Sequence, residues 1–206
     1  MPRRWEREQA IARKFMENVR ADLGFGLAGI RGDIVLSSKY SGGLRDVFGI
    51  YIIYPADFLH ALTEEGFVDH APTYPSVYLK SHRDVWVQRI DGHILSDWSL
   101  CLYVPGEADI NFRQVNSLER LLEVVKTFLV LERIYQRRIQ REPETGIEAK
   151  WPGPERSHGL GGYVEAIRDR GGISDTDLCI CGSGLRFARC HKQRLQAHEA
   201  KKSEAA

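Results

Sequence analysis

Two sets of residues in this sequence carry groups that take part in chemistry. Three cysteines and a histidine cluster near the C-terminus, and a fourth cysteine, Cys101, stands alone in the stretch HILSDWSLCLYVP. A thiolate can bind a soft metal ion or act as a nucleophile. The spacing and the neighbours of each set indicate which of these two chemistries it serves.

The C-terminal set has the spacing of a metal site. The stretch CICGSGLRFARCH places its candidate ligands in the order C-x-C-x8-C-H, as Cys179, Cys181, Cys190 and His191. Three thiolates and one imidazole make a tetrahedral set for Zn²⁺ with no position open for water, so we predict a structural zinc. The alternative is three reduced cysteines brought together by chance. So short a segment cannot bury a core, and metal would supply its folding free energy, about 10–16 kcal/mol in small zinc sites.

This segment also resembles a known zinc motif. Gly182-Ser183-Gly184 and the aromatic Phe187, together with the four ligands, resemble the SEC-C motif, in which C-x-C-G-S-G precedes an aromatic residue and a terminal Cys-Cys or Cys-His pair. The resemblance implies a bacterial source and a small docking module of the kind appended to many enzymes. It does not identify the chemistry of the remaining chain.

Cys101 has two interpretations. A single buried cysteine often acts as a small hydrophobic residue. A catalytic role is favoured by the polar loop before it, which carries His93 and Asp97, and by Pro75 and Val77 about 25 residues upstream. The corresponding alternatives are that His93 caps a turn and that Asp97 is a solvated loop charge.

Composition excludes several classes of function. The chain has 206 residues and a formal net charge of +1, so no global field attracts it to nucleic acid or to a membrane surface. No apolar run approaches the roughly 18 residues of a membrane span, and the N-terminus is charged from Arg3 onward without an apolar stretch, so we expect no signal peptide. One isolated and three clustered cysteines fit a reducing compartment. We therefore expect a cytoplasmic protein with no direct nucleic-acid or membrane partner.

Hydrophobic patterns predict the elements that position these groups. Apolar residues at every fourth position favour an N-terminal helix, and a capping box at Asn116 and Glu119 favours a long helix after the cysteine. Between them lie β-rich runs, so we predict an α+β fold with helices packed beside an antiparallel sheet. The expected helices cover 3–23, 116–141 and 163–170, and the expected strands cover 30–36, 47–54, 77–79 and 85–87.

The same patterns divide the chain. A first domain is expected over 1–150, followed by a Pro/Gly-rich connector with a short helix over 151–176. The zinc-binding motif then occupies 177–193, and a charged tail follows over 194–206.

The order of motifs before Cys101 resembles the ubiquitin-conjugating enzyme family. Tyr74-Pro75-Ser76-Val77 matches its Pro-Pro-x-Val strand, Asp91-Gly92-His93 occupies its His-Pro-Asn turn, and Leu100-Cys101-Leu102 matches the Ile-Cys-Leu end that holds its catalytic cysteine. Ser96-Asp97 matches the polar loop. The resemblance covers roughly 3–142. One departure is that His93 replaces the Asn of the family, which helps the oxyanion to form.

The resemblance implies a fold and an activity. It implies an antiparallel sheet of the ubiquitin-conjugating type, flanked by an N-terminal helix and a long C-terminal helix. Cys101 would carry a ubiquitin-like protein, or the C-terminus of a partner, as a thioester, and His93 and Asp97 would assist its transfer to an amine. Implied partners are a ubiquitin-like modifier or a cGAS-like nucleotidyltransferase of bacterial antiphage (CBASS) operons, and an activating enzyme. The alternatives are an inactive scaffold of the same fold and a cysteine hydrolase using Cys101 and His93.

Overall fold

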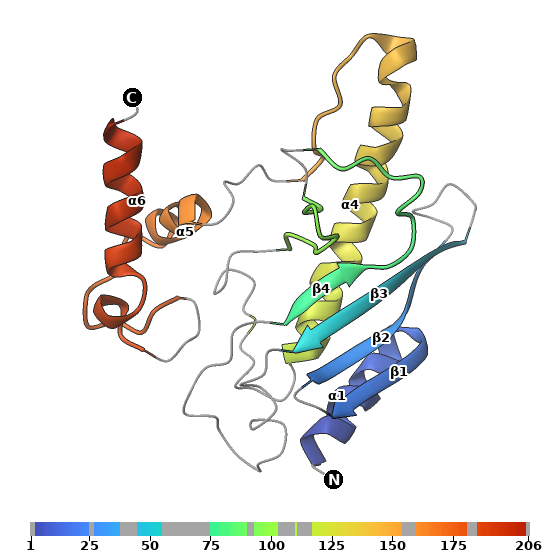
Figure 1. The fold of residues 1–206 in the computed structure, drawn as a ribbon, viewed down its shortest axis with the longest axis horizontal. Helices are drawn as coiled ribbons and strands as arrows, with labels where there is room; N and C mark the ends of the chain where they lie inside the picture. Colours follow the sequence, from blue (N-terminus) through green and yellow to red (C-terminus); the bar gives the residue numbers. More distant parts are fainter. Residues whose placement is uncertain are drawn as a thin grey trace.

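The protein has an α+β fold, as the sequence predicts. The computed structural model describes residues 3–24, 27–37, 45–54, 75–89, 93–102, 110, 117–153, 160–180 and 185–204. These residues form a four-stranded antiparallel sheet, an N-terminal helix, a long helix and shorter helices toward the C-terminus (Figure 1). No helix in these ranges is long and apolar enough to cross a membrane. The predicted site residue Cys181 and the motif residues Tyr74, Asp91 and Gly92 lie outside the described residues.

The N-terminal helix is shorter than predicted. Helix α1 covers Arg3–Phe15, and the second half of the predicted helix 3–23 is instead strand β1, Glu17–Gly24. Within β1, Asn18 takes a left-handed conformation with φ of 53°, which asparagine tolerates better than most residues, and it lies at the irregularity in the pairing with β2 between Glu17 and Arg20. Val19 and Leu23 continue the four-residue spacing of the helix, but residues four apart also share one face of a strand. The pairing of this segment with β2 makes it a strand.

The sheet is a meander in the order β1-β2-β3-β4. Strand β2 covers Leu27–Leu36, β3 covers Asp46–Tyr54 and β4 covers Ser76–Leu79, and each neighbouring pair is antiparallel. Every second residue of β3 is buried, from Phe48 to Tyr54, as expected for a strand with one face on the core.

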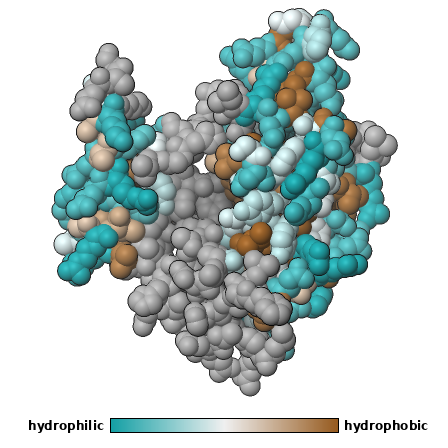
Figure 2. Space-filling model, in the orientation of Figure 1, coloured by the Kyte–Doolittle hydropathy of each residue, from teal (hydrophilic) through white to brown (hydrophobic). Residues whose placement is uncertain are grey.

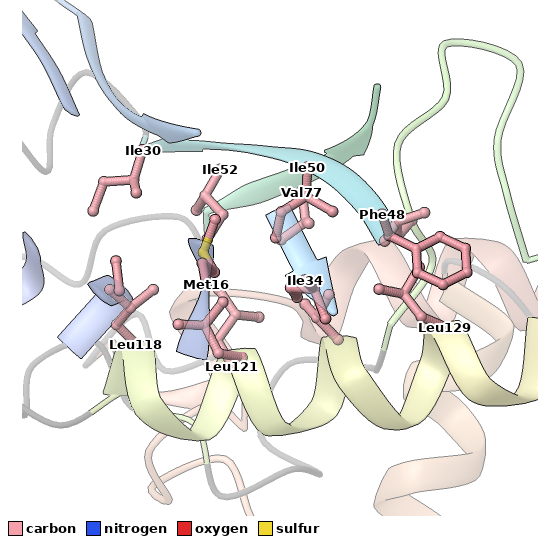
Figure 3. Close-up of a cluster of buried hydrophobic side chains, with 14 of the residues drawn as sticks. Met16, Ile30, Ile34, Phe48, Ile50, Ile52, Val77, Leu118, Leu121 and Leu129 are labelled. Atoms are coloured by element: carbon pink, nitrogen blue, oxygen red, sulfur yellow. The ribbon is translucent and has the colours of Figure 1, made fainter. Parts of the chain in front are cut away.

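The long helix covers the apolar face of this sheet. Helix α4, Ser117–Thr145, places Leu118, Leu121 and Leu129 against side chains of the sheet (Figure 3). Its buried residues recur at three- and four-residue spacings, which turns one stripe of the helix toward the core. The sheet contributes Ile30, Ile34, Phe48, Ile50, Ile52 and Val77 to the same cluster.

Helix α4 extends beyond its predicted end near residue 141. Pro143 lies in its last turn, where it lacks the N–H that would donate to the carbonyl four residues earlier, yet the helix continues to Thr145. The Thr145 hydroxyl donates to the Arg141 carbonyl, and Gly146 closes the end with φ of +65°. The break therefore falls at Gly146 and not at the proline.

The predicted strand over 85–87 is absent, and a side chain takes the place of its partner. Residues 86–89 are irregular. The Gln136 amide of α4 accepts the Val87 N–H at 2.9 Å and donates to the Val87 carbonyl at 2.8 Å. Gln136 thus satisfies both backbone groups of Val87 as a neighbouring strand would, and it fixes this segment to α4.

Glu132, one turn before Gln136, makes stability depend on pH. Its side chain is buried, and burial raises its pKa to about 7, opposed by the hydrogen bond from Gln136. The folded chain therefore holds a proton that the unfolded chain releases between about pH 4.5 and 7, so this residue lowers stability as pH rises through that window.

Replacement of Glu132 by glutamine is expected to remove this effect. The gain in unfolding free energy over wild type should grow from pH 4.5 to 8, toward an upper limit of about 3 kcal/mol, because each tenfold change in proton affinity corresponds to about 1.36 kcal/mol. Urea unfolding at several pH values measures it. Glu144→Gln, an exposed change on the same helix, is the matched control and should show no such trend. A gain independent of pH would contradict the assignment.

A second group of elements follows the first. Helix α5 covers Leu160–Asp169, the short 3-10 helix η1 covers Phe187–Arg189, and α6 covers Lys192–Glu204. Their buried residues form a cluster separate from the sheet core, centred on Tyr163, Ala166, Cys179, Phe187 and Leu195. On the face shown in Figure 2, the described surface is mostly hydrophilic and its hydrophobic residues form separate patches.

Candidate thiol site and metal centre

Cys101 ends a tight hairpin at the edge of the sheet. The second arm of the hairpin pairs with β4: Leu100 N–H donates to the Val77 carbonyl at 2.8 Å, and Leu79 N–H donates to the Trp98 carbonyl at 2.9 Å. The two arms are held together by the Cys101 N–H, which donates to the His93 carbonyl at 2.8 Å, and by a bridge between Ile94 and Leu100. Cys101 therefore directly follows Ser99 and Leu100, whose isolated β-bridges continue the antiparallel pairing beyond β4.

This register makes His93 and Cys101 cross-strand neighbours. Side chains alternate along a hairpin, so opposite residues share a face and their Cβ atoms lie about 4.5–5.5 Å apart. Ile94 and Leu100 are both buried, whereas His93 and Cys101 are both half-buried. The imidazole and the thiol thus share the face of the hairpin opposite to that of Ile94 and Leu100.

Asp97 stabilises the turn of this hairpin. Its carboxylate accepts the Ser99 N–H at 2.9 Å and the Ser99 hydroxyl at 2.6 Å, and these hydrogen bonds lower its pKa. The side chain is exposed. The role that these contacts support for Asp97 is turn formation.

Trp98 takes the position in which such hairpins usually hold glycine. Trp98 N–H donates to the Leu95 carbonyl at 2.8 Å, and Trp98 has φ of 67°, the pattern of a type I turn followed by a left-handed residue. The Arg83 guanidinium lies over the indole, 5.4 Å from the ring centroid. This contact and packing against the core offset the cost of the left-handed conformation, about 1–2 kcal/mol.

The His93 ring packs against Trp151, a residue that follows the long helix. The ring centroids are 4.2 Å apart, and Trp151 also contacts Phe128 and Tyr135 of α4 at 5.7 and 5.6 Å. Trp151 is therefore wedged between α4 and the hairpin, where it restricts the imidazole beside Cys101.

A strap of residues 146–153 carries Trp151 back along α4. The Arg138 guanidinium donates to the Lys150 carbonyl at 2.8 Å, and the Ala149 N–H donates to the Glu142 carboxylate. The same carboxylate forms an ion pair with Arg89, in the segment that leads to the hairpin. Glu142 thus joins the strap, the long helix and the chain before His93, and the Arg89 hydrogen bond lowers its pKa.

The environment of Cys101 does not activate it strongly. Burial raises the pKa of its thiol. Hydrolytic cysteines are commonly activated by a depressed pKa, so this site lacks that signature. A carrier that exchanges an acyl group between thiols needs access and orientation more than a low pKa.

The metal centre forms where the chain returns on itself after α5. The Cys179 N–H donates to the Leu185 carbonyl at 2.9 Å, and Leu178 pairs with Arg186. Helix η1 then leads to Cys190 and His191, at the start of α6. These turns bring together two ligands from one side of the loop and one from the other, with Cys181 outside the described residues.

Three donor atoms converge in this centre. The His191 Nδ1 lies 3.1 Å from the Cys190 sulfur and 3.4 Å from the Cys179 sulfur, and the three atoms lie within 4.8 Å of one another. In a tetrahedral zinc site with bonds of about 2.3 Å to sulfur and 2.0 Å to nitrogen, the N···S separation is about 3.5 Å. The donor set and spacing therefore fit Zn²⁺.

The comparisons with known proteins identify this centre and nothing else in the chain. Residues 176–193 match the SEC-C motif. A search of curated proteins and a search of solved structures gave no significant match. The motif match and the Cys179, Cys190 and His191 group together indicate a metal site, with zinc as the expected ion.

The structure adds two residues that sequence reasoning missed. Trp151 contacts the predicted site residue His93, and Tyr163 stacks on the predicted ligand His191. Both contacts join segments distant in sequence, so no local spacing indicates them. The one signal was composition: Trp151 opens the WPGP stretch, an unusual place for a large aromatic unless it packs.

Proposed function

We propose that this protein is a bacterial ubiquitin-conjugating-like transferase that carries a ubiquitin-like protein as a thioester on Cys101. The observation that carries the proposal is the cross-strand pair of Cys101 and His93. It lies at the end of a meander that follows an N-terminal helix and precedes a long helix. This order matches the layout that the resemblance implies, although the comparisons identify only the metal motif.

The chemistry consists of two acyl transfers. The Cys101 thiolate attacks the thioester of an activated modifier, a new C–S bond forms, and the first thiol leaves with its electron pair and takes a proton. An amine then attacks the carbonyl carbon, the C–S bond to Cys101 breaks, and the product is an amide. The His93 imidazole would donate to the developing oxyanion or accept a proton from the amine.

Zinc would have a structural role in this protein. Cys179, Cys190 and His191 would hold it, and Cys181 would complete a closed set of four protein ligands. A bound Zn²⁺ with that set supplies folding free energy and no open coordination position. The metal module, by which we mean the SEC-C segment 176–193, would recruit or orient a partner. By analogy alone, that partner is a nucleotidyltransferase of the cGAS type in antiphage defence.

An inactive scaffold of the same fold is the second candidate. The raised pKa of the Cys101 thiol and the absence of the family's Asn favour it. Such a protein would bind its partners through the sheet domain and the metal module without forming a covalent bond.

A reducible gel shift separates these functions. The full-length protein is incubated with candidate modifiers and an activating enzyme, and samples are run with and without reducing agent. A conjugating enzyme gives a reducible band that is lost in Cys101→Ala. A hydrolase instead cleaves a labelled conjugate, and a scaffold does neither. If no modifier gives the band and the protein still captures its partners, the conjugating function is excluded and the scaffold function is supported.

Trp151 is expected to influence transfer through His93. Trp151→Leu removes the ring that restricts the imidazole, so amine transfer from loaded Cys101 should fall about tenfold, less than the roughly 10²–10⁴-fold that complete acid–base assistance provides. Loading should change little. In the background of His93→Gln, Trp151→Leu should have no further effect on transfer, and Trp151→Phe should retain most of the wild-type rate.

Single-turnover discharge to free lysine measures this double-mutant cycle. Urea unfolding of each variant serves as the control, because a general loss of stability would lower transfer equally with or without His93. Additive losses from the two substitutions would show that Trp151 acts independently of His93.

A further inference from the structure

We propose that the metal module includes helix α5, and that Tyr163 is a positioning residue for the ligand His191. This inference rests on the proposed metal site and is independent of the thiol chemistry. The motif match covers only 176–193, so α5 lies entirely before it. The contacts that tie α5 to the metal ligands lie outside the motif pattern.

The first contact is a ring stack on the ligand itself. The Tyr163 and His191 rings are 4.7 Å apart and 13° from parallel. Tyr163 is buried, so its ring forms one wall of the space that the imidazole occupies. A flat partner on a histidine ring fixes its plane, and here that plane directs Nδ1 toward both sulfurs, at 3.1 and 3.4 Å.

The second observation is that α5 and the ligands share one core. Cys179 is buried in the same cluster as Tyr163 and Ala166, and Cys190 packs against that cluster. Phe187 and Leu195 complete it from the other side of the metal loop. A cluster this small gives little stability alone, so metal binding and the packing of α5 should depend on each other.

The third observation is the ordered connection from α5 to the first ligand. The Gly172 N–H donates to the Ile167 carbonyl and the Gly171 N–H to the Arg168 carbonyl, both at 2.9 Å, which is a Schellman ending. Gly171 and Gly172 both have positive φ, +79° and +103°, which glycine adopts without strain. The Asp177 carboxylate then accepts the Ser174 N–H at 2.7 Å. This segment therefore fixes the direction in which the chain leaves α5.

Three substitutions in the full chain test the proposal. Tyr163→Leu removes the stacked ring, and Tyr163→Phe keeps it. Leu195→Ala is the matched control, because it deletes another buried side chain of the same cluster. Zn²⁺ affinity is measured against a competing chelator, and the visible spectrum of the Co²⁺-substituted protein reports the ligand geometry.

Tyr163→Leu is expected to weaken Zn²⁺ binding about tenfold or more, as for other residues that orient a metal ligand, and to alter the Co²⁺ spectrum. Tyr163→Phe should preserve both. Leu195→Ala should weaken binding without altering the spectrum. Wild-type affinity and spectrum in Tyr163→Leu would overturn the positioning role.

Hydrogen exchange tests the extent of the module. Chelation of the metal should remove protection from the amides of α5 as well as from those after residue 176. Protection in α5 that survives chelation would overturn the inclusion of α5. Wild-type protein that binds neither Zn²⁺ nor Co²⁺ would overturn the metal site as well, and gel-shift activity of Cys101 would remain a separate result.

Discussion

Cys101→Ser is expected to abolish the reducible adduct of this protein. A serine hydroxyl is a far weaker nucleophile than a thiolate at neutral pH, so loading should become slow or undetectable. Any adduct that forms would be an oxygen ester and should survive reducing agent. Gel electrophoresis with and without thiol, followed by peptide mass spectrometry, distinguishes the two bonds and locates the modified residue.

The other cysteines provide the control for this result. Cys190→Ser removes a thiol of the metal centre and should leave loading at Cys101 intact. The raised pKa of Cys101 adds a pH test: because more thiolate forms as pH rises, the loading rate should increase up to and beyond pH 9. A reducible band that persists in Cys101→Ser would assign the acyl group to another residue.

Removal of the metal is expected to unfold residues 160–180 and 185–204 and leave the sheet and α4 folded. Structural zinc supplies about 10–16 kcal/mol in small sites, and the second cluster is far too small to replace it. The described core of the sheet and α4 is a separate cluster, so it should retain its own unfolding transition. Chelation followed by hydrogen exchange, region by region, measures both responses.

Cys190→Ser should reproduce the effect of chelation without any chelator, since it removes one thiolate from the metal centre. Cys101→Ser is the matched control and should bind metal as wild type does. Loss of protection in the sheet domain on chelation would contradict the independence of the two clusters. Protection retained over 185–204 would contradict a folding role for the metal.

Sequence patterns predicted those elements whose periodicity has one explanation. The stripe of α4, from Leu118 to Leu129, fits only a helix, and the β-rich run that ends at Tyr54 fits a strand. The apolar residues Val19 and Leu23 fit both periods, so their assignment depended on the pairing with β2, which sequence does not show. The local pattern predicts the type of element only where the apolar residues fit the 3.6-residue period of a helix or the two-residue period of a strand, but not both.

The residues of the two sites also divide into those that the sequence predicts and those that only the packed structure reveals. The candidate metal ligands Cys179, Cys190 and His191 are predictable because they lie close together in sequence with the donor types and spacing of a metal site. Their supporting residues, Trp151 and Tyr163, act through contacts between distant segments, and those contacts exist only after packing. The geometry between His93 and Cys101 falls between these cases, because a hairpin register follows from a short turn.

The carboxylate shared by Arg89 and Ala149 has a practical consequence for anyone who shortens this protein. A fragment that stops where the long helix ends would lose Trp151 and uncover one side of the His93 ring. It would also lose the Ala149 N–H that donates to Glu142, so that this carboxylate would keep its ion pair with Arg89 but not its bond to the strap. The shortest fragment that keeps the thiol surroundings intact should therefore extend through Gly153.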